Sequence, residues 1–310
     1  MTNIRISIIT AVYNRADKVH RVFESLELST FRNFELVMVD DGSSDNLVDI
    51  VEYYRKRVTY PITFIKKKNG GKHTAINLMY EIARGEYIFS LDSDDELMPD
   101  AMGKALNVWD NMPERERNKY WCVCGRNVDN NSTIIGELFP DNINNKDFNI
   151  SRKIASKIRG DKMSLQKLDI VKRYKFPEPK NVTFVTEKIV WNRIDKDYKQ
   201  YYTNDIFGIV YKDAGNRLSN SARNMQTAIN NYFNCLYQIN NSYNLNIGIK
   251  EYIELQIRFF LNAAIVPQNV AASVGVLNKK HKIFNILIAP IALILLPQYK
   301  RKYGVQEVIK

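Results

Sequence analysis

The sequence predicts an α/β protein with a mainly parallel, Rossmann-like sheet flanked by helices, followed by a helical C-terminal extension. Four apolar runs rich in β-branched residues occur in the first hundred residues, at Ile6–Val12, Phe34–Val39, Ile62–Ile65 and Tyr87–Leu91. Each is followed by apolar residues at i, i+3, i+4 and i+7, starting from Val19, Leu47, Ile76 and Met102. Strands that alternate with amphipathic helices form right-handed βαβ units, so we expect these strands to run parallel.

The pattern changes after about residue 115. Two strands and two helices are predicted beyond it, at Tyr120–Val128, Thr133–Leu138, Glu187–Ile194 and Ile249–Ala264. The last of these is a long helix with apolar residues along one face, and the whole chain after Ser221 is helical in pattern. We therefore expect three parts, with bounds of 1–115, 116–220 and 221–310.

Two of the predicted helices are preceded by capping residues. Ser43-Ser44-Asp45 precedes the helix that starts near Leu47, and Pro99 with Asp100 precedes the one near Met102. Hydroxyl and carboxylate oxygens accept hydrogen bonds from the free N–H groups of a first helical turn. We therefore expect these residues to cap the two helices.

The composition is that of a basic globular protein. The 310 residues carry a formal net charge of +11, from 45 Lys and Arg against 34 Asp and Glu. That excess favours acidic partners such as phosphate-bearing substrates, nucleic acid or an anionic membrane surface, although a solvated basic surface would give the same count. Neither Gly-x-Gly-x-x-Gly nor Gly-x₄-Gly-Lys-[Ser/Thr] occurs, which argues against a nicotinamide-dependent dehydrogenase and a P-loop hydrolase.

Cysteine and histidine usage indicates a reducing compartment and no histidine-based zinc site. Cys122 and Cys124 lie two apart in a predicted strand and Cys235 is isolated, so we expect packed thiols and no disulfide framework. The three histidines are too scattered to form a zinc site. Because Met1 leads directly into a strand pattern without signal-peptide features, we expect a cytoplasmic protein.

The stretch Ile283–Leu296 is apolar except for Asn285 and an interrupting Pro290, and basic clusters flank it at 279–282 and 300–302. Fourteen helical residues would span about 21 Å, short of the ~30 Å hydrocarbon core of a bilayer. Two interpretations are open. Residues 283–297 form a segment that rests on an anionic membrane surface, which would place the protein at the inner face of the plasma membrane, or they form a buried C-terminal core helix.

Carboxylates gather at the carboxyl ends of the predicted strands, where an open α/β sheet binds its ligands. Asp40-Asp41 follows the second strand and Asp92–Asp95 follows the fourth. Such carboxylates repel one another unless a cation or a hydrogen-bond donor lies among them. Asp92-Ser93-Asp94 offers the oxygen ligands that Mg²⁺ and Mn²⁺ prefer, so we predict a divalent metal here. The triplet alone is common, and the acidic cluster could instead cap the helix that follows.

Taken together, the segments at these strand ends resemble glycosyltransferase family 2, which has the GT-A fold. The matching segments occur in the family's order, as Ser7–Asn14, Val39–Asp45, Asn69–Lys72 with Asn77, Ala83–Tyr87 and Leu91–Asp95. One departure is Ala11, where the family commonly has proline. The resemblance implies an inverting enzyme that uses a nucleotide-sugar donor and Mn²⁺ or Mg²⁺.

The resemblance also assigns donor-binding roles by position. The nucleotide-sugar-binding residues would be Thr10, Ala11, Tyr13, Asp40, Lys72, Asp92 and Ser93. Thr10, Ala11 and Tyr13 would cradle the base, with the Tyr13 ring stacked on it. Asp40 would accept a hydrogen bond from the base, an arrangement that favours uracil. Ordinary packing at the end of a strand is the alternative for Tyr13.

Closer to the transferred sugar, Lys72 would lie near the donor's ribose or diphosphate. Asp92 would lie beside the ribose, and Asp94 would bind the metal. For Gly70-Gly71, which precedes Lys72, a plain turn into the next helix is the alternative.

A weaker match from Gly160 to Asn192 resembles the acceptor half of one branch of the family. Glu187 stands at the position of that branch's catalytic base, although the usual Glu-Asp pair is absent because Lys188 follows. An exposed glutamate in the first turn of a helix is the alternative. On this basis 1–115 would be the nucleotide-sugar-binding half of the GT-A domain, 116–220 the acceptor-binding half and 221–310 the helical, membrane-associating region.

The resemblance implies transfer of a sugar from a UDP-linked donor onto a saccharide or lipid-linked acceptor. The process would be cell-surface polysaccharide or glycolipid synthesis. Nucleic acid is not an expected partner.

Two other classes of protein stay open. A phosphatase of the haloacid dehalogenase type would use Asp92 as nucleophile and Asp94 as acid/base, but Asp95 and three preceding strands do not fit its motif. A non-catalytic module that binds membrane or nucleic acid would need basic and aromatic residues in a recognised arrangement.

Overall fold

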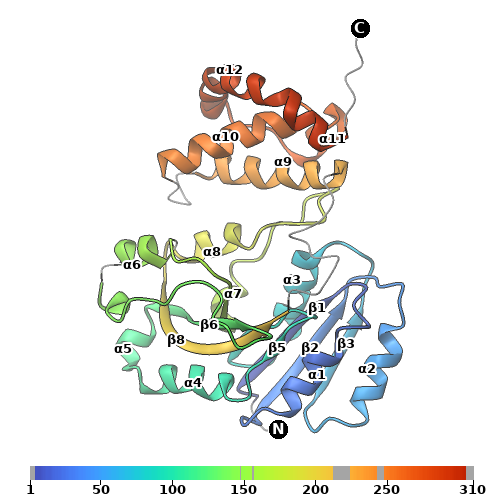
Figure 1. Ribbon diagram of the computed structural model, residues 1–310, viewed down its shortest axis with the longest axis vertical. Coiled ribbons are helices and arrows are strands. Elements are labelled where there is room, and N and C mark those ends of the chain that lie inside the picture. The colour runs from blue at the N-terminus through green and yellow to red at the C-terminus, as the bar shows by residue number, and fades with distance from the viewer. Residues whose placement is uncertain (1–3, 147, 156, 212–223, 243–247, 305–310) are drawn as a thin grey trace. The chain divides into compact units, whose positions relative to one another are not determined.

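The computed structural model describes residues 4–146, 148–155, 157–211, 224–242 and 248–304. The chain divides into two compact units. The sheet unit comprises residues 1–69, 75–175 and 197–214, and the helical unit comprises residues 70–74, 176–196 and 215–310. Figure 1 labels the elements of both units.

The sheet unit is built on a sheet that has eight strands among the described residues (Figure 1). They are β1 (Ile6–Val12), β2 (Phe34–Asp40), β3 (Ile62–Lys66), β4 (Tyr87–Ser90), β5 (Glu96–Leu97), β6 (Tyr120–Asp129), β7 (Lys162–Lys167) and β8 (Lys199–Val210). Their order is β3-β2-β1-β4-β7-β6-β8-β5. Strands β1 to β4 pair in parallel, as do β6 and β8, whereas β7 and β5 run antiparallel to their neighbours. The mixed but mostly parallel sheet confirms the predicted fold class.

Helices connect and flank these strands. In the sheet unit they are α1 (His20–Glu27), α2 (Leu47–Arg55), most of α3 (Lys72–Ile82), α4 (Ala101–Asn111), α5 (Glu114–Arg117), α6 (Phe148–Ala155) and α7 (Leu168–Val171), with a 3₁₀ turn at Ile143–Asn145. The chain steps from β1 through β2 to β3 and then returns to β4 on the other side of β1. Because parallel crossovers are right-handed, this reversal places α3 on the opposite face of the sheet from α1 and α2.

A buried core fills the space between one face of the sheet and α1, α2 and α4. Alternate strand residues point into it, among them Ile6, Ile8, Phe34, Leu36, Met38, Tyr87 and Phe89. All seven residues of β2 are buried, including Glu35, whose carboxylate accepts hydrogen bonds from Ser7 Oγ at 2.7 Å and Arg84 Nε at 2.8 Å. Burial on both faces explains why the central strands are almost continuous apolar runs in the sequence.

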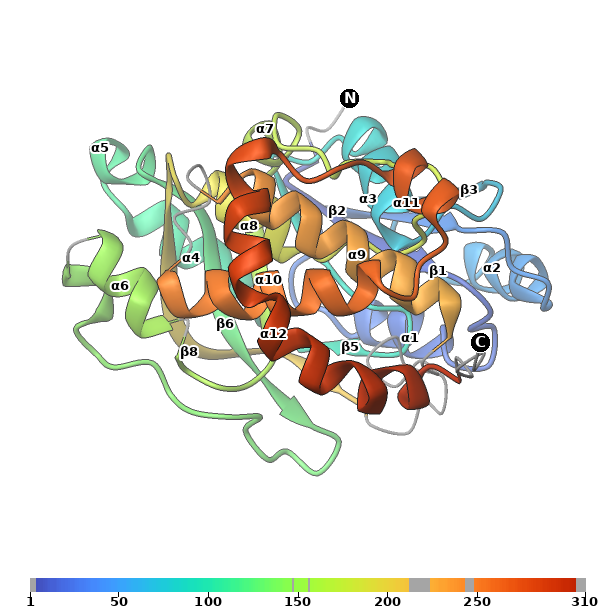
Figure 2. The same cartoon turned by 90° about the horizontal axis from the view of Figure 1, so that it is seen from above.

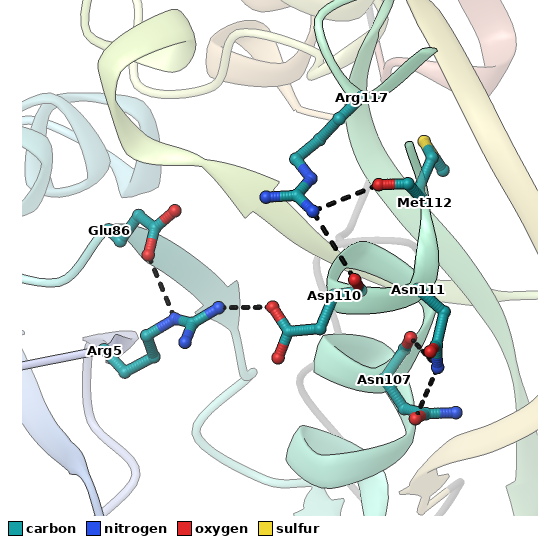
Figure 3. Close-up of polar contacts among 7 residues, drawn as sticks. All are labelled: Arg5, Glu86, Asn107, Asp110, Asn111, Met112 and Arg117. Carbon is teal, nitrogen blue, oxygen red and sulfur yellow. Dashed lines mark hydrogen bonds and ion pairs between the residues drawn. The ribbon is translucent and has the colours of Figure 1, made fainter. Parts of the chain in front are cut away.

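Arg5 ties the beginning of β1 to β4 and α4 (Figure 3). Its Nε lies 3.0 Å from Glu86 Oε2, and its Nη2 lies 2.6 Å from Asp110 Oδ1. Just beyond α4, Arg117 Nη2 donates to the main-chain oxygen of Met112 at 3.0 Å. The contacts of Arg5 thus join the amino ends of β1 and β4, two of the three strands whose carboxyl ends carry the candidate site.

The predicted strand at Thr133–Leu138 is wrong. Only Ile134 forms a bridge there, an isolated one to Val128. Gly136 adopts a φ of +90°, and a Cβ on it would lie 2.0 Å from the main-chain oxygen of Arg159. The chain turns at this glycine to pass close to another backbone segment, so it cannot continue as a strand.

The predicted cap of α4 is correct in position, but the capping hydrogen bonds expected at α2 and α4 are wrong. The N-cap positions of α2 and α4 are Asn46 and Asp100, and neither side chain makes a capping hydrogen bond. Ser43 Oγ accepts instead from Asn14 N at 2.9 Å, and the carboxylate of Asp45 bonds to the same loop after β1. The hydroxyl and carboxylate therefore join two loops at the edge of the sheet.

The helical unit contains α8 (Lys188–Ile194), α9 (Met225–Asn240), α10 (Ile249–Ala263), α11 (Gln268–Val274) and α12 (Lys279–Lys302). Helices α8 and α10 confirm the two helices predicted in this part of the sequence. Figure 1 shows α10 between α9 and α12, and Figure 2 shows α12 crossing over α10. Polar pairs join α10 to α12: Tyr252 Oη lies 2.6 Å from His281 Nδ1, and Tyr299 Oη donates to Asn262 Oδ1 at 2.9 Å.

Helix α12 is longer than the apolar stretch suggested. It has 24 residues because both basic clusters continue the helix, so it spans about 36 Å at about 1.5 Å per residue. Among the described residues it is the one helix long and apolar enough to cross a membrane, a criterion of length and composition alone. Only 11% of its most apolar window is buried, and side chains such as Ile283, Leu287 and Ile294 are exposed. The interpretation of this segment as a buried core helix is therefore wrong.

Candidate functional site

The loops that follow β1 and β2 are locked together at the carboxyl edge of the sheet. Asn14 has a φ of +51°, and its Oδ1 accepts from Ser44 N at 2.9 Å. Gly42 has a φ of +85°, and a Cβ on it would lie 2.8 Å from Asn69 N. A positive φ and a close backbone neighbour both require glycine here, so the turn after β2 has a defined shape.

Asp40, at the end of β2, is fully buried in this edge. Its Oδ1 accepts from Ser43 N at 2.7 Å, whereas its Oδ2 accepts no hydrogen bond among the described residues. Lys66 Nζ lies 3.5 Å from that oxygen, at ion-pair distance. One carboxylate oxygen thus shapes the turn and the other has hydrogen-bonding capacity to spare.

The predicted base-binding residues lie along the end of the neighbouring strand β1. Thr10 is buried, and its Oγ1 has no hydrogen-bond partner among the described residues. Ala11 is half-buried, and Tyr13 is 51% exposed just after the strand. The exposed ring does not fit the alternative that Tyr13 is an ordinary packing residue. The sheet register places Val12 beside Asp40, so Tyr13 and Asp40 belong to the same edge.

Three carboxylates cluster after β4. Asp92 is exposed, Asp94 is half-buried and Asp95 is buried, and each offers an oxygen within 4.8 Å of the others. Ser93 between them is buried. Arg15 Nε lies 4.0 Å from Asp94 Oδ2 at one side of this cluster. An oxygen-only set of this kind suits a hard divalent cation, which takes carboxylate ligands and keeps further positions for substrate oxygens.

Asp95 is the inner member of the cluster. Burial raises its pKa to about 7, and the charges of Asp92 and Asp94 act in the same direction, although a hydrogen bond from Tyr211 N at 3.0 Å opposes them. Two neighbouring carboxylates thus oppose the ionisation of Asp95, as like charges in one site do. The helix that follows has Asp100 at its N-cap position, so the alternative that this cluster caps α4 is wrong.

Lys72 and Glu187 form an ion pair within the helical unit. Lys72 Nζ lies 3.2 Å from Glu187 Oε1, with the two side chains 25% and 39% exposed. Glu187 occupies the N-cap position of α8 without making a capping hydrogen bond. Gly71, next to Lys72, has a φ of +94°, and a Cβ on it would lie 2.0 Å from the main-chain oxygen of Thr183. Only glycine fits where these two chain segments approach so closely. The alternative of a plain turn at Gly70-Gly71 does not account for this contact.

Two buried asparagines of α9 hold the segment that leads to Glu187. Asn230 Oδ1 accepts from Thr183 N at 2.9 Å, and Asn234 Oδ1 accepts from Thr186 N at 3.0 Å. Asn234 Nδ2 also donates to the main-chain oxygen of Phe184 at 3.1 Å. Sequence reasoning missed these two residues, although asparagines four positions apart on the apolar face of a helix are a usable signal of such contacts.

The predicted site residues therefore form two groups. Those of the sheet unit lie at its carboxyl edge after β1, β2 and β4, and they are Thr10, Ala11, Tyr13, Asp40, Asp92, Ser93 and Asp94. The helical unit brings Lys72 and Glu187 together.

The chain belongs to the family described as Glycosyl transferase family 2, whose sequence profile matches residues 7–174. A glycosyltransferase of Escherichia coli K12, YibD, itself uncharacterised, is 33% identical over 121 residues, which cover 38% of this chain. The match spans only about a third of the relative's own length, 35%. The chain is thus a member of a glycosyltransferase family, which contradicts the phosphatase alternative.

Solved structures with the same fold cover nearly the whole chain. TarS of S. aureus, residues 1–349 in complex with UDP-GlcNAc, has a TM-score of 0.61 at 16% identity, over 97% of this chain and 91% of that one. The mannosyltransferase PcManGT of Pyrobaculum calidifontis, in complex with GDP-Man and Mn²⁺, has a TM-score of 0.55 at 16% identity, over 97% and 83%. These likenesses confirm the predicted GT-A type of fold.

Proposed function

We propose that this glycosyltransferase moves a sugar from a UDP-linked donor to an acceptor hydroxyl, with inversion at the anomeric carbon. Two features of the same sheet edge carry the proposal. One is Asp40, a buried carboxylate whose second oxygen can still accept a hydrogen bond, and the other is the acidic cluster of Asp92, Asp94 and Asp95. The first suits an N–H donor on a base, and the second suits a cation that accompanies a diphosphate.

In the donor half, Thr10 and Ala11 line the base and the exposed Tyr13 ring stacks on it. Asp40 accepts from the base N–H, which suits uracil. TarS was solved with UDP-GlcNAc and PcManGT with GDP-Man, so the fold serves both kinds of base, and the assignment to UDP rests on these residues. Asp92 and Ser93 lie beside the ribose.

Asp94 is the proposed ligand of Mn²⁺ or Mg²⁺. Its half-buried carboxylate lies with those of Asp92 and Asp95, and this all-oxygen set fits such an ion. A divalent cation held there supplies positive charge against the nucleoside diphosphate as that group leaves. Asp95 offers the third carboxylate oxygen of this set.

In the acceptor half, Glu187 is the proposed general base. Its carboxylate takes the proton of the acceptor hydroxyl while that oxygen attacks the anomeric carbon and the bond to the diphosphate oxygen breaks. Lys72 contacts Glu187 in the structure, and its contact with the donor's ribose or diphosphate stays a prediction. In this proposal residues 1–115 bind the donor, 116–220 contribute to acceptor binding and 221–310 carry the membrane contact.

The enzyme is proposed to act in the cytoplasm, held peripherally at the inner face of the plasma membrane by α12. Exposed isoleucines and leucines between two basic clusters match an anionic lipid surface. This placement suits a saccharide or lipid-linked acceptor in cell-surface polysaccharide or glycolipid synthesis.

The test is donor use with and without metal. We expect UDP-sugars to raise the melting temperature of the protein in the presence of Mn²⁺, more than GDP-sugars do, and to be hydrolysed slowly without acceptor. Asp94→Ala should abolish both the metal dependence and turnover. Near-normal turnover of Asp94→Ala with metal present would sink the metal assignment, and a preference for GDP-sugars would sink the assignment to UDP.

A further inference from the structure

A cavity of about 1150 Å³ lies entirely within the helical unit. Its walls come from α9, α10, the end of α12 and the segment before α8. The cavity is larger than the roughly 300–1,000 Å³ of most small-molecule pockets, so it has room for a chain of several units.

The lining of this cavity is polar. Ten of its 22 residues are Thr, Asn or Gln, and only Phe184, Cys235 and Leu255 have apolar side chains. The rings of Tyr299 and Tyr303 add two aromatic faces with hydroxyl groups, 4.9 Å apart between centroids. The buried amides of Asn230, Asn234 and Gln238 bond within the protein. The less buried amides of Gln226 and Asn231 and the tyrosine rings are therefore the groups that suit a polyhydroxylated ligand.

Positive charge is in excess in the same lining. Four residues are basic and two are acidic, and Lys188 is neutralised by an ion pair with Glu251. Lys250, Arg258 and Lys302 are exposed, and they form no ion pair with the described part of the chain. A guanidinium presents parallel N–H donors that match a phosphate group, and two lysine ammonium groups add to the local charge.

We propose that this cavity binds the acceptor, and that the acceptor is a saccharide or polyol chain that carries phosphate groups. The inference rests on the proposed function and names its acceptor class. Thr186 and Lys188, on either side of the proposed base Glu187, both line the cavity. A chain bound there lies beside the turn that carries the base, with its phosphates at Arg258 and Lys302 and its hydroxyl groups near Gln226 and Asn231.

The test is direct binding of two fluorescent probes to the full-length protein without donor: a glycerol phosphate oligomer and a neutral maltooligosaccharide of similar length. The wild type should bind the phosphate-bearing probe at least tenfold more tightly, and added salt should weaken this binding. Arg258→Glu and Lys302→Glu, both at exposed positions, should each weaken it at least fivefold. Lys196→Glu, an exposed lysine of the same unit outside the lining, is the matched control.

Equal binding of the two probes would overturn the phosphate-bearing class, and equal effects of Arg258→Glu and Lys196→Glu would overturn the location. Circular dichroism of each variant identifies loss of fold, and Lys302→Glu, at the last residue of α12, is a second variant if Arg258→Glu does not fold. Hydrolysis of a UDP-sugar by the wild type is measured in parallel. Its absence would contradict the donor half of the proposed function without affecting the probe measurement, so the two failures are distinguishable.

Discussion

Lys72 Nζ lies 3.2 Å from Glu187 Oε1, so the residue proposed to meet the donor and the residue proposed as base contact each other. The contact gives the carboxylate a defined direction at the beginning of α8. A general base must be held within hydrogen-bond reach of the proton it removes, so the neighbours of Glu187 matter as much as its charge. The helical unit supplies these neighbours from α3 and, through the preceding segment, from α9.

Replacing Glu187 with Gln should separate binding from chemistry. Glutamine has nearly the same shape but cannot take a proton, so we expect kcat for transfer to fall by about 10² to 10⁴. Donor affinity, measured by nucleotide-sugar titration, should stay within about twofold, because the side chain has no proposed donor contact. Glu114→Gln, on the exposed surface of α5, is the control. Transfer above a tenth of the wild-type rate would remove Glu187 from the mechanism.

Lys72→Met should distinguish the two roles of this lysine. Because its Nζ contacts Glu187 and is also proposed to meet the donor's ribose or diphosphate, we expect kcat to fall at least tenfold and the donor KM to rise. Lys72→Arg should restore part of the rate, since a guanidinium can form the same pair. A fall in kcat with an unchanged donor KM would remove the donor contact, and a rise in donor KM with kcat retained would remove the role beside Glu187.

Asn234→Ala should both destabilise the helical unit and slow transfer. The change leaves the N–H of Thr186 and the carbonyl of Phe184 without their partners, which costs about 1–3 kcal/mol for each group that stays buried. Urea unfolding followed by fluorescence measures the loss, and kcat reports the displaced base. Asn107→Ala, at an exposed position of α4, should change the unfolding free energy by less than about 0.5 kcal/mol. A stable variant with normal kcat would mean that Asn234 does not position Glu187.

The fold of the first hundred residues was predictable because β1, β2 and β4 are almost wholly buried and the helices are amphipathic. Local pattern alone therefore places β1 to β4 within one or two residues of their observed bounds. The strand expected at Thr133–Leu138 has the same local pattern but fails, because a contact with the backbone at Arg159 decides its course. Such a contact between distant segments has no period that a sequence window can detect.

The candidate site divides in the same way. Asp40 and Asp94 were predictable because strand ends of a parallel sheet share one edge, so their order in the sequence implies their position in space. The pair between Lys72 and Glu187 and the support from Asn230 depend on how a glycine turn passes Thr183. These contacts arise from packing of the helical unit and were visible only in three dimensions.

The three cysteines should be unreactive in the folded protein. Cys122, Cys124 and Cys235 are free and buried, and burial raises the pKa of the Cys235 thiol to about 12. A thiol reagent at pH 8 should label none of them quickly and all three after denaturation. The raised pKa means that the folded state disfavours the thiolate of Cys235. Its contribution to the free energy of unfolding is therefore fully present below the unfolded-state pKa of about 8.5, and it is lost as the pH rises towards 12. Cys235→Ala should reduce the loss of stability between pH 8 and 10, and an unchanged pH dependence would contradict the assignment.

Helix α12 should attach the protein to anionic bilayers. Each lysine near such a surface contributes about 1 kcal/mol, so replacing Lys279, Lys280 and Lys282 with Gln should weaken binding to phosphatidylglycerol vesicles by about 100-fold. Replacing the exposed Ile283 and Leu287 with Ser should abolish the remaining binding, since the apolar face is what enters the lipid. Lys56→Gln, on the exposed end of α2, is the control in co-sedimentation.

Equal binding to phosphatidylcholine vesicles would contradict the electrostatic part of this prediction. Protein that stays with membranes through alkaline carbonate would mean that α12 crosses the bilayer, for which its length suffices, and does not rest on it.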